Sequence, residues 1–172
     1  MGESVEFESV EFITAGALGP PGQRAFYVQA AAQGRLVSLL AEKEQVRSLS
    51  QLAQRLLARA GVTLRPDDLD EAGHRLREPA EPLWRAGSMS LGVDDDAERF
   101  LLEVEELPAE RDEPDEGQGI ARFWLQASQL AGMAAHAAYA VEAGARPLCK
   151  LCQRPIEPTG HVCPSLNGHG PK

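Results

Sequence analysis

Three cysteines and a histidine near the end of the chain have the residue types and the spacing of a zinc site. The cysteines of the 172 residues are Cys149, Cys152 and Cys163, and His161 stands shortly before the last of them. The pattern C-x2-C-x8-H-x-C supplies three thiolates and one imidazole, which are ligands that a tetrahedral Zn²⁺ accepts. We therefore predict that these four residues bind zinc, with His169 as an alternative fourth ligand in place of His161.

The spacing groups the four predicted ligands into two pairs that can converge on one point. A short turn separates the first two cysteines, so both sulfurs can face one metal. His161 and Cys163 flank a single residue, and side chains two positions apart share a face of an extended chain. The prolines and the glycine between the pairs favour a reversing loop. Four protein ligands leave no open position for a reactive water, so we predict a structural zinc ion.

The cysteine count and the N-terminal residues indicate the compartment. An odd number of cysteines argues against a disulfide framework, in which cysteines occur in pairs. The first residues lack the charged and apolar segments of a secretory signal peptide. We therefore expect reduced thiols and a cytoplasmic protein. The sequence contains no apolar run of the length that crosses a bilayer, so we predict no membrane span.

The charge of the chain limits the partners that it can bind. The net charge is −9 and the isoelectric point is about 4.9. Binding to nucleic acid depends on a concentrated basic surface, so a general nucleic-acid-binding protein is disfavoured. Arg146, Lys150 and Arg154 nevertheless lie around the first two cysteines. Nucleic-acid binding through the zinc segment is therefore an alternative.

Alternating hydrophobic patterns predict an α+β fold built on an antiparallel sheet of four to five strands. Residues 24–30 alternate between the two faces of a strand, and residues 35–41 return as a second strand after a glycine-containing turn, which predicts a hairpin. Residues 84–93 and 99–106 have the same pattern and predict a second hairpin. A further extended segment begins at Val10.

Two helices are expected to pack on this sheet. Apolar side chains recur every three or four residues from 42 to 60, which indicates an amphipathic helix. The alanine-rich residues 120–144 predict a long second helix. The chain is therefore expected to divide into a sheet region at 1–107, an acidic flexible linker at 108–119, the long helix, and a zinc knuckle at 145–172.

No enzyme motif accompanies the predicted zinc site. The sequence lacks the G-x-S-x-G pattern of a serine nucleophile, and the three cysteines are expected to bind zinc. We therefore expect a non-enzymatic protein that binds a partner protein through its zinc knuckle. The alternative is an enzyme or a small-molecule-binding protein, including one for phosphate-related ligands. Its site would use polar residues of the predicted sheet face, namely Gln23, Arg24, Gln29, Glu42 and Lys43.

Four stretches of the sequence carry a resemblance to a bacterial family. They are residues 22–30, 42–46, 87–94 and 146–168, and the last of them is the most specific. Together they resemble a family, best known in actinobacteria, that combines an N-terminal antiparallel sheet, an arginine- or alanine-rich helix and a terminal zinc knuckle. The resemblance covers most of the chain outside the expected loops.

The resemblance implies which proteins are encoded near this one, but it implies no activity. Members of the family are typically encoded with a phosphomutase-like protein and a protein similar to phosphoinositide-type kinases, which implies a shared pathway and makes either protein a candidate for the unknown partner. This sequence has Lys150 and Gln153 where the family pattern implies proline and glycine. Neither residue is a predicted ligand, so the departure concerns the turn and leaves the zinc prediction unchanged.

Overall fold

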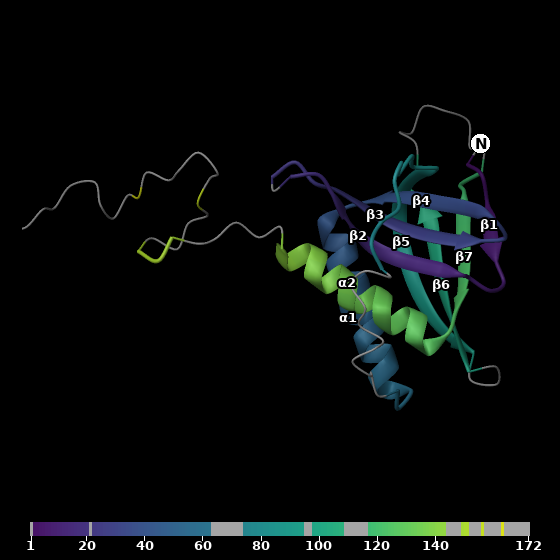
Figure 1. Ribbon diagram of the computed structural model, residues 1–172. Helices are drawn as coiled ribbons and strands as arrows, with labels where there is room; N and C mark the ends of the chain where they lie inside the picture. Colours follow the sequence, from purple (N-terminus) through teal and green to yellow (C-terminus); the bar gives the residue numbers. More distant parts are fainter. Residues whose placement is uncertain are drawn as a thin grey trace, which may run out of the picture.

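The computed structural model describes residues 2–20, 22–62, 74–94, 98–108, 117–143, 149–151, 156 and 163. Within them the chain forms one seven-stranded sheet and two helices (Figure 1). The strands are β1 (Val5–Phe7), β2 (Phe12–Leu18), β3 (Ala25–Ala32), β4 (Arg35–Ala41), β5 (Trp84–Asp94), β6 (Arg99–Glu106) and β7 (Ile120–Leu125). The helices are α1 (Lys43–Arg59) and α2 (Ala127–Ala143).

The sheet consists of two antiparallel three-stranded units, each of which is followed by a helix. β2, β3 and β4 form the first unit, which leads into α1, and β5, β6 and β7 form the second, which leads into α2. A short parallel pairing of β4 with β5, in which Leu39 lies opposite Trp84, joins the units. β1 pairs in parallel with β7 and completes the order β1-β7-β6-β5-β4-β3-β2.

Both helices cover one face of the sheet, and each reaches the unit that it does not follow (Figure 1). α2 packs mainly on β2 of the first unit, while α1 packs on β5 of the second unit as well as on β3. The helices also pack against each other. The buried Ser50 hydroxyl of α1 donates a hydrogen bond of 2.7 Å to the Ala134 carbonyl of α2, which fixes the two helices relative to each other.

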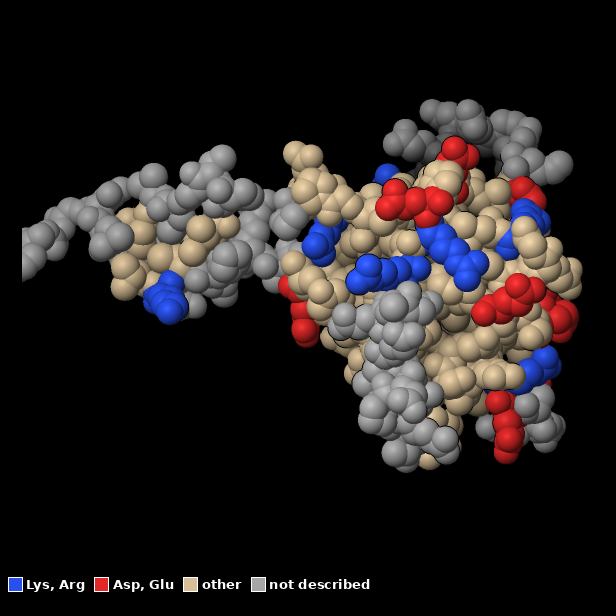
Figure 2. All heavy atoms as spheres, viewed as in Figure 1, with Lys and Arg blue, Asp and Glu red and all other residues tan. Residues whose placement is uncertain are grey.

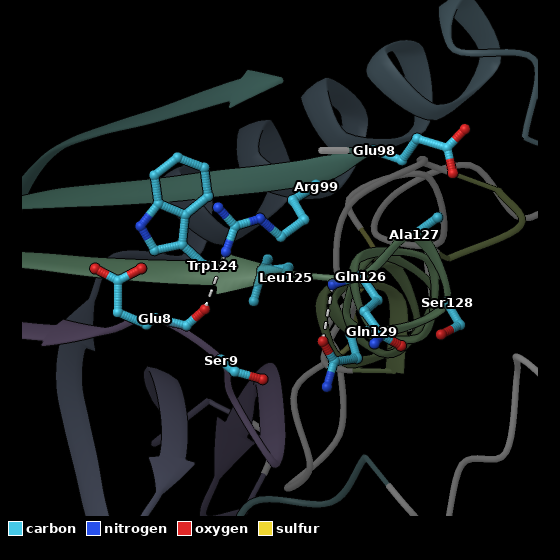
Figure 3. Close-up of a pocket in the computed structure, with 10 residues that line it drawn as sticks. All are labelled: Glu8, Ser9, Glu98, Arg99, Trp124, Leu125, Gln126, Ala127, Ser128 and Gln129. Carbon is cyan, nitrogen blue, oxygen red and sulfur yellow. Dashed lines mark hydrogen bonds between the residues drawn. The ribbon is translucent and has the colours of Figure 1, made fainter. Parts of the chain in front are cut away.

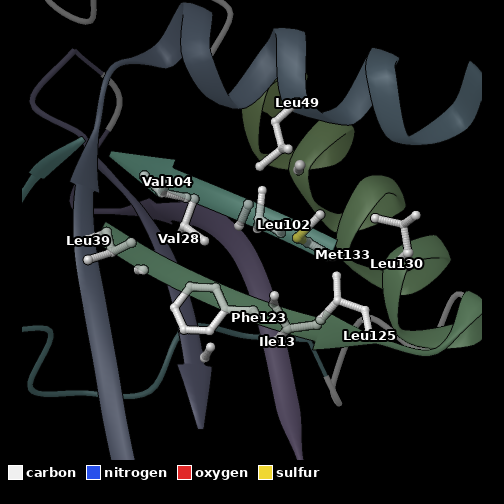
Figure 4. Close-up of a cluster of buried hydrophobic side chains, with 14 of the residues drawn as sticks. Ile13, Val28, Leu39, Leu49, Leu102, Val104, Phe123, Leu125, Leu130 and Met133 are labelled. Atoms are coloured by element: carbon white, nitrogen blue, oxygen red, sulfur yellow. The ribbon is translucent and has the colours of Figure 1, made fainter. Parts of the chain in front are cut away.

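Fully buried apolar side chains fill the space between the sheet and the helices (Figure 4). Leu49 projects from α1, and Leu130 and Met133 project from α2. They meet the strand residues Ile13, Val28, Leu39, Leu102, Val104, Phe123 and Leu125. The ring centroids of Phe123 and Phe7 are 5.6 Å apart, so β1 is held by the same core. Each side chain of this size stabilises the fold by about 1.5–3 kcal/mol on burial.

A glutamine in the first turn of each helix links that helix to the other unit. The Gln45 side chain accepts a 2.7 Å hydrogen bond from the Glu42 N–H and donates one of 2.6 Å to the Gly87 carbonyl of β5. The Gln129 side chain likewise accepts from the N–H of the preceding cap residue and donates a 2.8 Å bond to the Val10 carbonyl before β2. Each glutamine therefore satisfies a helix N-terminus and positions a strand at the same time.

Replacing Gln45 by alanine is expected to lower the free energy of unfolding by about 1–2 kcal/mol, because the cap bond and the bond to β5 are both lost. The measurement is urea unfolding followed by circular dichroism. Gln51→Ala, at an exposed position of the same helix, is the matched control and should change stability little. Equal midpoints for the two variants would contradict the proposed role of Gln45.

The predicted α+β class is confirmed, but the predicted antiparallel sheet of four to five strands is wrong. The sheet has seven strands and contains two parallel pairings. The two predicted hairpins correspond to β3–β4 and β5–β6, and the predicted first helix corresponds to α1. β1 and β7 are absent from the prediction. β1 has only three residues and begins among acidic side chains, so it has little pattern of its own.

β7 occupies residues that were predicted to begin the long helix. Residues 120–125 form a strand and α2 begins at Ala127, so the predicted helix start at 120 is wrong. Buried residues alternate with half-buried ones through β7, which is the two-residue period of a strand. The sheet therefore extends beyond the predicted boundary at 107. Most of the predicted linker, at 109–116, lies outside the described residues.

Candidate functional site

Cys149 and Cys163, two of the predicted zinc ligands, lie side by side. Their Sγ atoms are 3.7 Å apart. Both side chains are buried, at 9% and 5% exposed. A disulfide bond requires about 2.05 Å between the sulfurs, so the pair is not a disulfide. Two thiolates bound at about 2.3 Å to one tetrahedral zinc lie about 3.8 Å apart, so the observed separation fits the edge of such a site.

The remaining predicted ligands, Cys152 and His161, lie outside the described residues, as does the alternative ligand His169. Among the residues that the structure does describe, no group of three or more His, Cys, Asp or Glu side chains is placed to hold a metal ion. The set of four ligands therefore stays a prediction. Of the four residues, the structure describes Cys149 and Cys163.

Arg24, a candidate binding residue, lies at the C-terminal end of α2. Its guanidinium donates a hydrogen bond of 3.3 Å to the carbonyl of Ala140, in the last turn of that helix. The last carbonyls of a helix have no partner within the helix and carry partial negative charge, so a cation there is favourable. α2 has no basic side chain in its own last turn. Arg24, which directly precedes β3, therefore supplies the positive charge that the last turn of α2 lacks.

Gln29, a second candidate, is fully buried in β3 and forms hydrogen bonds within the fold. Its amide nitrogen donates 2.9 Å bonds to the Ser38 hydroxyl of β4 and to the Arg77 carbonyl. Its amide oxygen accepts a 2.8 Å bond from the Arg77 N–H. Gln29 thus pairs with both backbone groups of Arg77, as a neighbouring strand would, and holds that residue on the sheet.

Buried polar groups also fix His74, which belongs to the same irregular stretch as Arg77. The buried Thr14 hydroxyl of β2 donates a hydrogen bond to the His74 carbonyl. The His74 ring lies so close to Gly132 of α2 that a Cβ there would meet Nε2 at 2.0 Å. No periodicity in the sequence predicts these contacts, because the partners come from β2, α2 and the stretch before β5.

The other three candidates do not join Gln29. Glu42 precedes α1, where its carboxylate lies 3.1 Å from the Arg85 guanidinium at the surface. Lys43 is half-buried at the start of the same helix, and Gln23 is exposed before β3. Arg24, Gln29 and Glu42 therefore belong to three separate sets of contacts.

The fold and the candidate site define an α+β protein of two β-β-β-α units with a buried cysteine pair near its C-terminus. The model of a family described as a protein of unknown function, DUF3090, matches residues 5–163. The chain belongs to this family. Comparison with curated proteins and with solved structures gives no match. Within the described part of the chain, neither helix has the length and apolar character needed to cross a membrane.

Proposed function

We propose that the protein is a zinc-binding accessory protein, in which a structural zinc ion shapes a docking surface for a partner protein. The observation that carries the proposal is the 3.7 Å separation of the buried Cys149 and Cys163 sulfurs. Cys152 and His161 complete the proposed ligand set. Bound zinc would join the two ends of the C-terminal loop and so stabilise its fold, as structural zinc does in small domains.

The extent of the family match favours His161 over His169 as the fourth ligand. The matched region ends at Cys163 and therefore includes His161 but not His169. His161 also stands beside a cysteine in the sequence, which keeps the second ligand pair together. We therefore assign the imidazole ligand to His161.

The contacts of the polar candidates favour an accessory protein over an enzyme that uses the sheet face. Gln29 is fully buried and bonded to Ser38 and Arg77, and Arg24 is bonded to the end of α2. These side chains therefore have structural roles that account for their presence. Four protein ligands on zinc would likewise leave no position for a substrate or a reactive water.

An exposed leucine beside the proposed zinc site supports a docking role. Leu151 lies between the first two cysteines and is 61% exposed, and the neighbouring Lys150 is also exposed. A large exposed apolar side chain is suited to enter a pocket of a partner protein. The partner that we propose is the phosphomutase-like or the kinase-like protein that the family resemblance implies.

Charge disfavours nucleic acid as the partner. The net charge is −9, and on the face shown in Figure 2 acidic and basic side chains are interspersed. A nucleic acid would be repelled by the acidic groups and would find no broad basic surface on this face. We therefore propose a protein partner.

The test is affinity capture from the native host with intact protein, Cys149→Ser and Leu151→Asp, followed by identification of the captured protein and measurement of its affinity in purified form. We expect the intact protein to bind, and both variants to bind at least about tenfold more weakly. Leu151→Asp should keep its zinc, which separates loss of the docking contact from loss of the metal.

Leu36→Asp is the matched control, because Leu36 is an exposed leucine of β4 at 38% exposure. It should bind the partner as the intact protein does. A partner that binds Leu151→Asp and the intact protein equally would show that the zinc segment is not the docking surface. Capture of nucleic acid, with an affinity that falls steeply with salt, would favour the nucleic-acid alternative.

A further inference from the structure

A second candidate site lies in a cavity of about 530 Å³ at the end of the second unit where β6 begins and β7 ends. The start of β6, the end of β7, the first turn of α2 and the bend after β1 form its walls (Figure 3). This volume is in the range of small-molecule sites. The cavity contains none of the predicted zinc ligands, so an inference about it goes beyond the proposed function and does not depend on zinc.

Arg99 is the cation of this cavity, and its ion pair with Asp94 within the described residues is a long one. The guanidinium carbon lies 4.6 Å from the centre of the Trp124 ring, which is a cation–π arrangement. Its polar contacts are long, at 3.4 Å to the Glu8 carbonyl and 3.8 Å to the Asp94 carboxylate. The side chain is 38% exposed, so its terminal nitrogens can still donate to an anionic group in the cavity.

Two carboxylates line the same cavity without pairing to Arg99. Within the described residues, neither the Glu8 nor the Glu98 carboxylate forms a hydrogen bond or an ion pair. Figure 3 shows the Arg99 guanidinium beside Trp124 and the Glu98 carboxylate directed away from it. The cavity is therefore lined by a cation and an anion that do not pair with each other.

The backbone at Glu98 adds a second observation. Its φ is 50°, in the left-handed region that side chains other than glycine seldom adopt. Glycine would relieve this conformation, yet the position carries a charged side chain at the edge of the cavity. Unfavourable backbone conformations of this kind concentrate at ligand-binding positions.

We propose that this cavity binds a small zwitterion, whose carboxylate pairs with Arg99 and whose ammonium group pairs with Glu98. The ligand class is that of a diamino acid or a short free peptide, which carries the two charges at opposite ends. Arg99 binds the carboxylate edge-on because Trp124 fixes the plane of the guanidinium. Glu98 then neutralises the ammonium group, which gives selectivity over simple carboxylates.

The test is isothermal titration of the full-length protein with three probes: lysine, dialanine and trialanine. We expect at least one of them to bind, and Arg99→Gln and Glu98→Gln each to weaken it about tenfold or more. Arg85→Gln and Glu81→Gln are the matched controls at exposed positions away from the cavity and should bind as the wild type does. The proposal is wrong if none of the probes binds to the wild type, or if Arg99→Gln binds equally well.

Derivatives of the probe that binds identify the recognised charges. Acetylation of a peptide's N-terminus, or of the Nε of lysine, removes the distal cation and amidation of the carboxylate removes the anion, and we expect either change to weaken binding. Undiminished binding of the N-acetyl form would overturn the zwitterion class. Glu98→Gly should raise the melting temperature, since glycine suits a φ of 50°, while weakening the probe. Equal probe affinity in Glu98→Gly and the wild type would overturn the assignment of Glu98.

Discussion

Purified Cys149→Ser protein is expected to lose almost all of the zinc that we propose the wild-type protein binds. Serine replaces a thiolate by a neutral hydroxyl, and zinc affinity depends on deprotonated ligands. Cys163→Ser should behave in the same way, because its sulfur lies 3.7 Å from that of Cys149 and would share the metal. The measurement is elemental analysis of zinc per chain after purification without added metal.

Three observations accompany this test. His161→Ala should lose zinc, whereas the control His169→Ala should keep it; the reverse result would move the fourth ligand to His169. Circular dichroism of Cys149→Ser should still show the sheet and helices, since the core residues lie in the β strands and in α1 and α2. A Cys149→Ser protein that kept one zinc per chain would show that the proposed ligand set is wrong.

Replacing Gln29 by leucine is expected to lower the free energy of unfolding by about 2–4 kcal/mol. Leucine has a similar size but cannot bond to Ser38 or to the backbone of Arg77, so buried polar groups lose their partners. Each such loss costs about 1–3 kcal/mol. The measurement is urea unfolding, combined with hydrogen exchange of the Arg77 amide, which should become faster.

Gln51→Leu provides the control for this substitution, because Gln51 is exposed on α1. Its stability should stay within about 0.5 kcal/mol of the wild type. If Gln29→Leu were equally mild, the hydrogen bonds of Gln29 would not be needed for the fold. A binding role for its side chain would then regain support.

Elements with a complete local pattern could be predicted from the sequence. β3 begins with alternating side chains and is joined to the apolar strand β4 by a glycine-containing turn, and α1 has apolar residues at helical spacing that become its buried face. These patterns arise because each element buries one face, and they do not depend on the rest of the chain. The zinc ligands could be proposed for a related reason, since the spacing of metal ligands is local, and they stay a prediction.

β7 shows where local patterns fail. Its six residues precede an alanine-rich helix with only Gln126 between them, so helix propensity extends across the boundary. What makes these residues a strand is pairing with β6 on one side and β1 on the other. β1 is the more extreme case, because three residues pair with a strand near the other end of the chain. Tertiary contacts decide both elements.

The candidate sites also differ in whether they depend on local sequence patterns or on tertiary contacts. Gln29 belongs to an alternating strand and its polarity suggests a ligand, but its contact with Arg77 depends on a stretch without regular structure. The cavity at Arg99 draws its walls from residues near 8, 98 and 124, so no local spacing could reveal it. Chemistry that depends on residues close in sequence can be predicted, and chemistry that depends on topology cannot.

Each helix packs on the unit that it does not follow in the chain, and this packing affects folding during synthesis on the ribosome. β2 emerges early, but α2, which covers it, is among the last described elements to be made. β1 must likewise wait for β7 before it has a partner. The first unit therefore leaves the ribosome with apolar surface still uncovered, and such surface is prone to aggregation and is bound by chaperones. We infer that the N-terminal half reaches its native packing only after β7 and α2 have been translated.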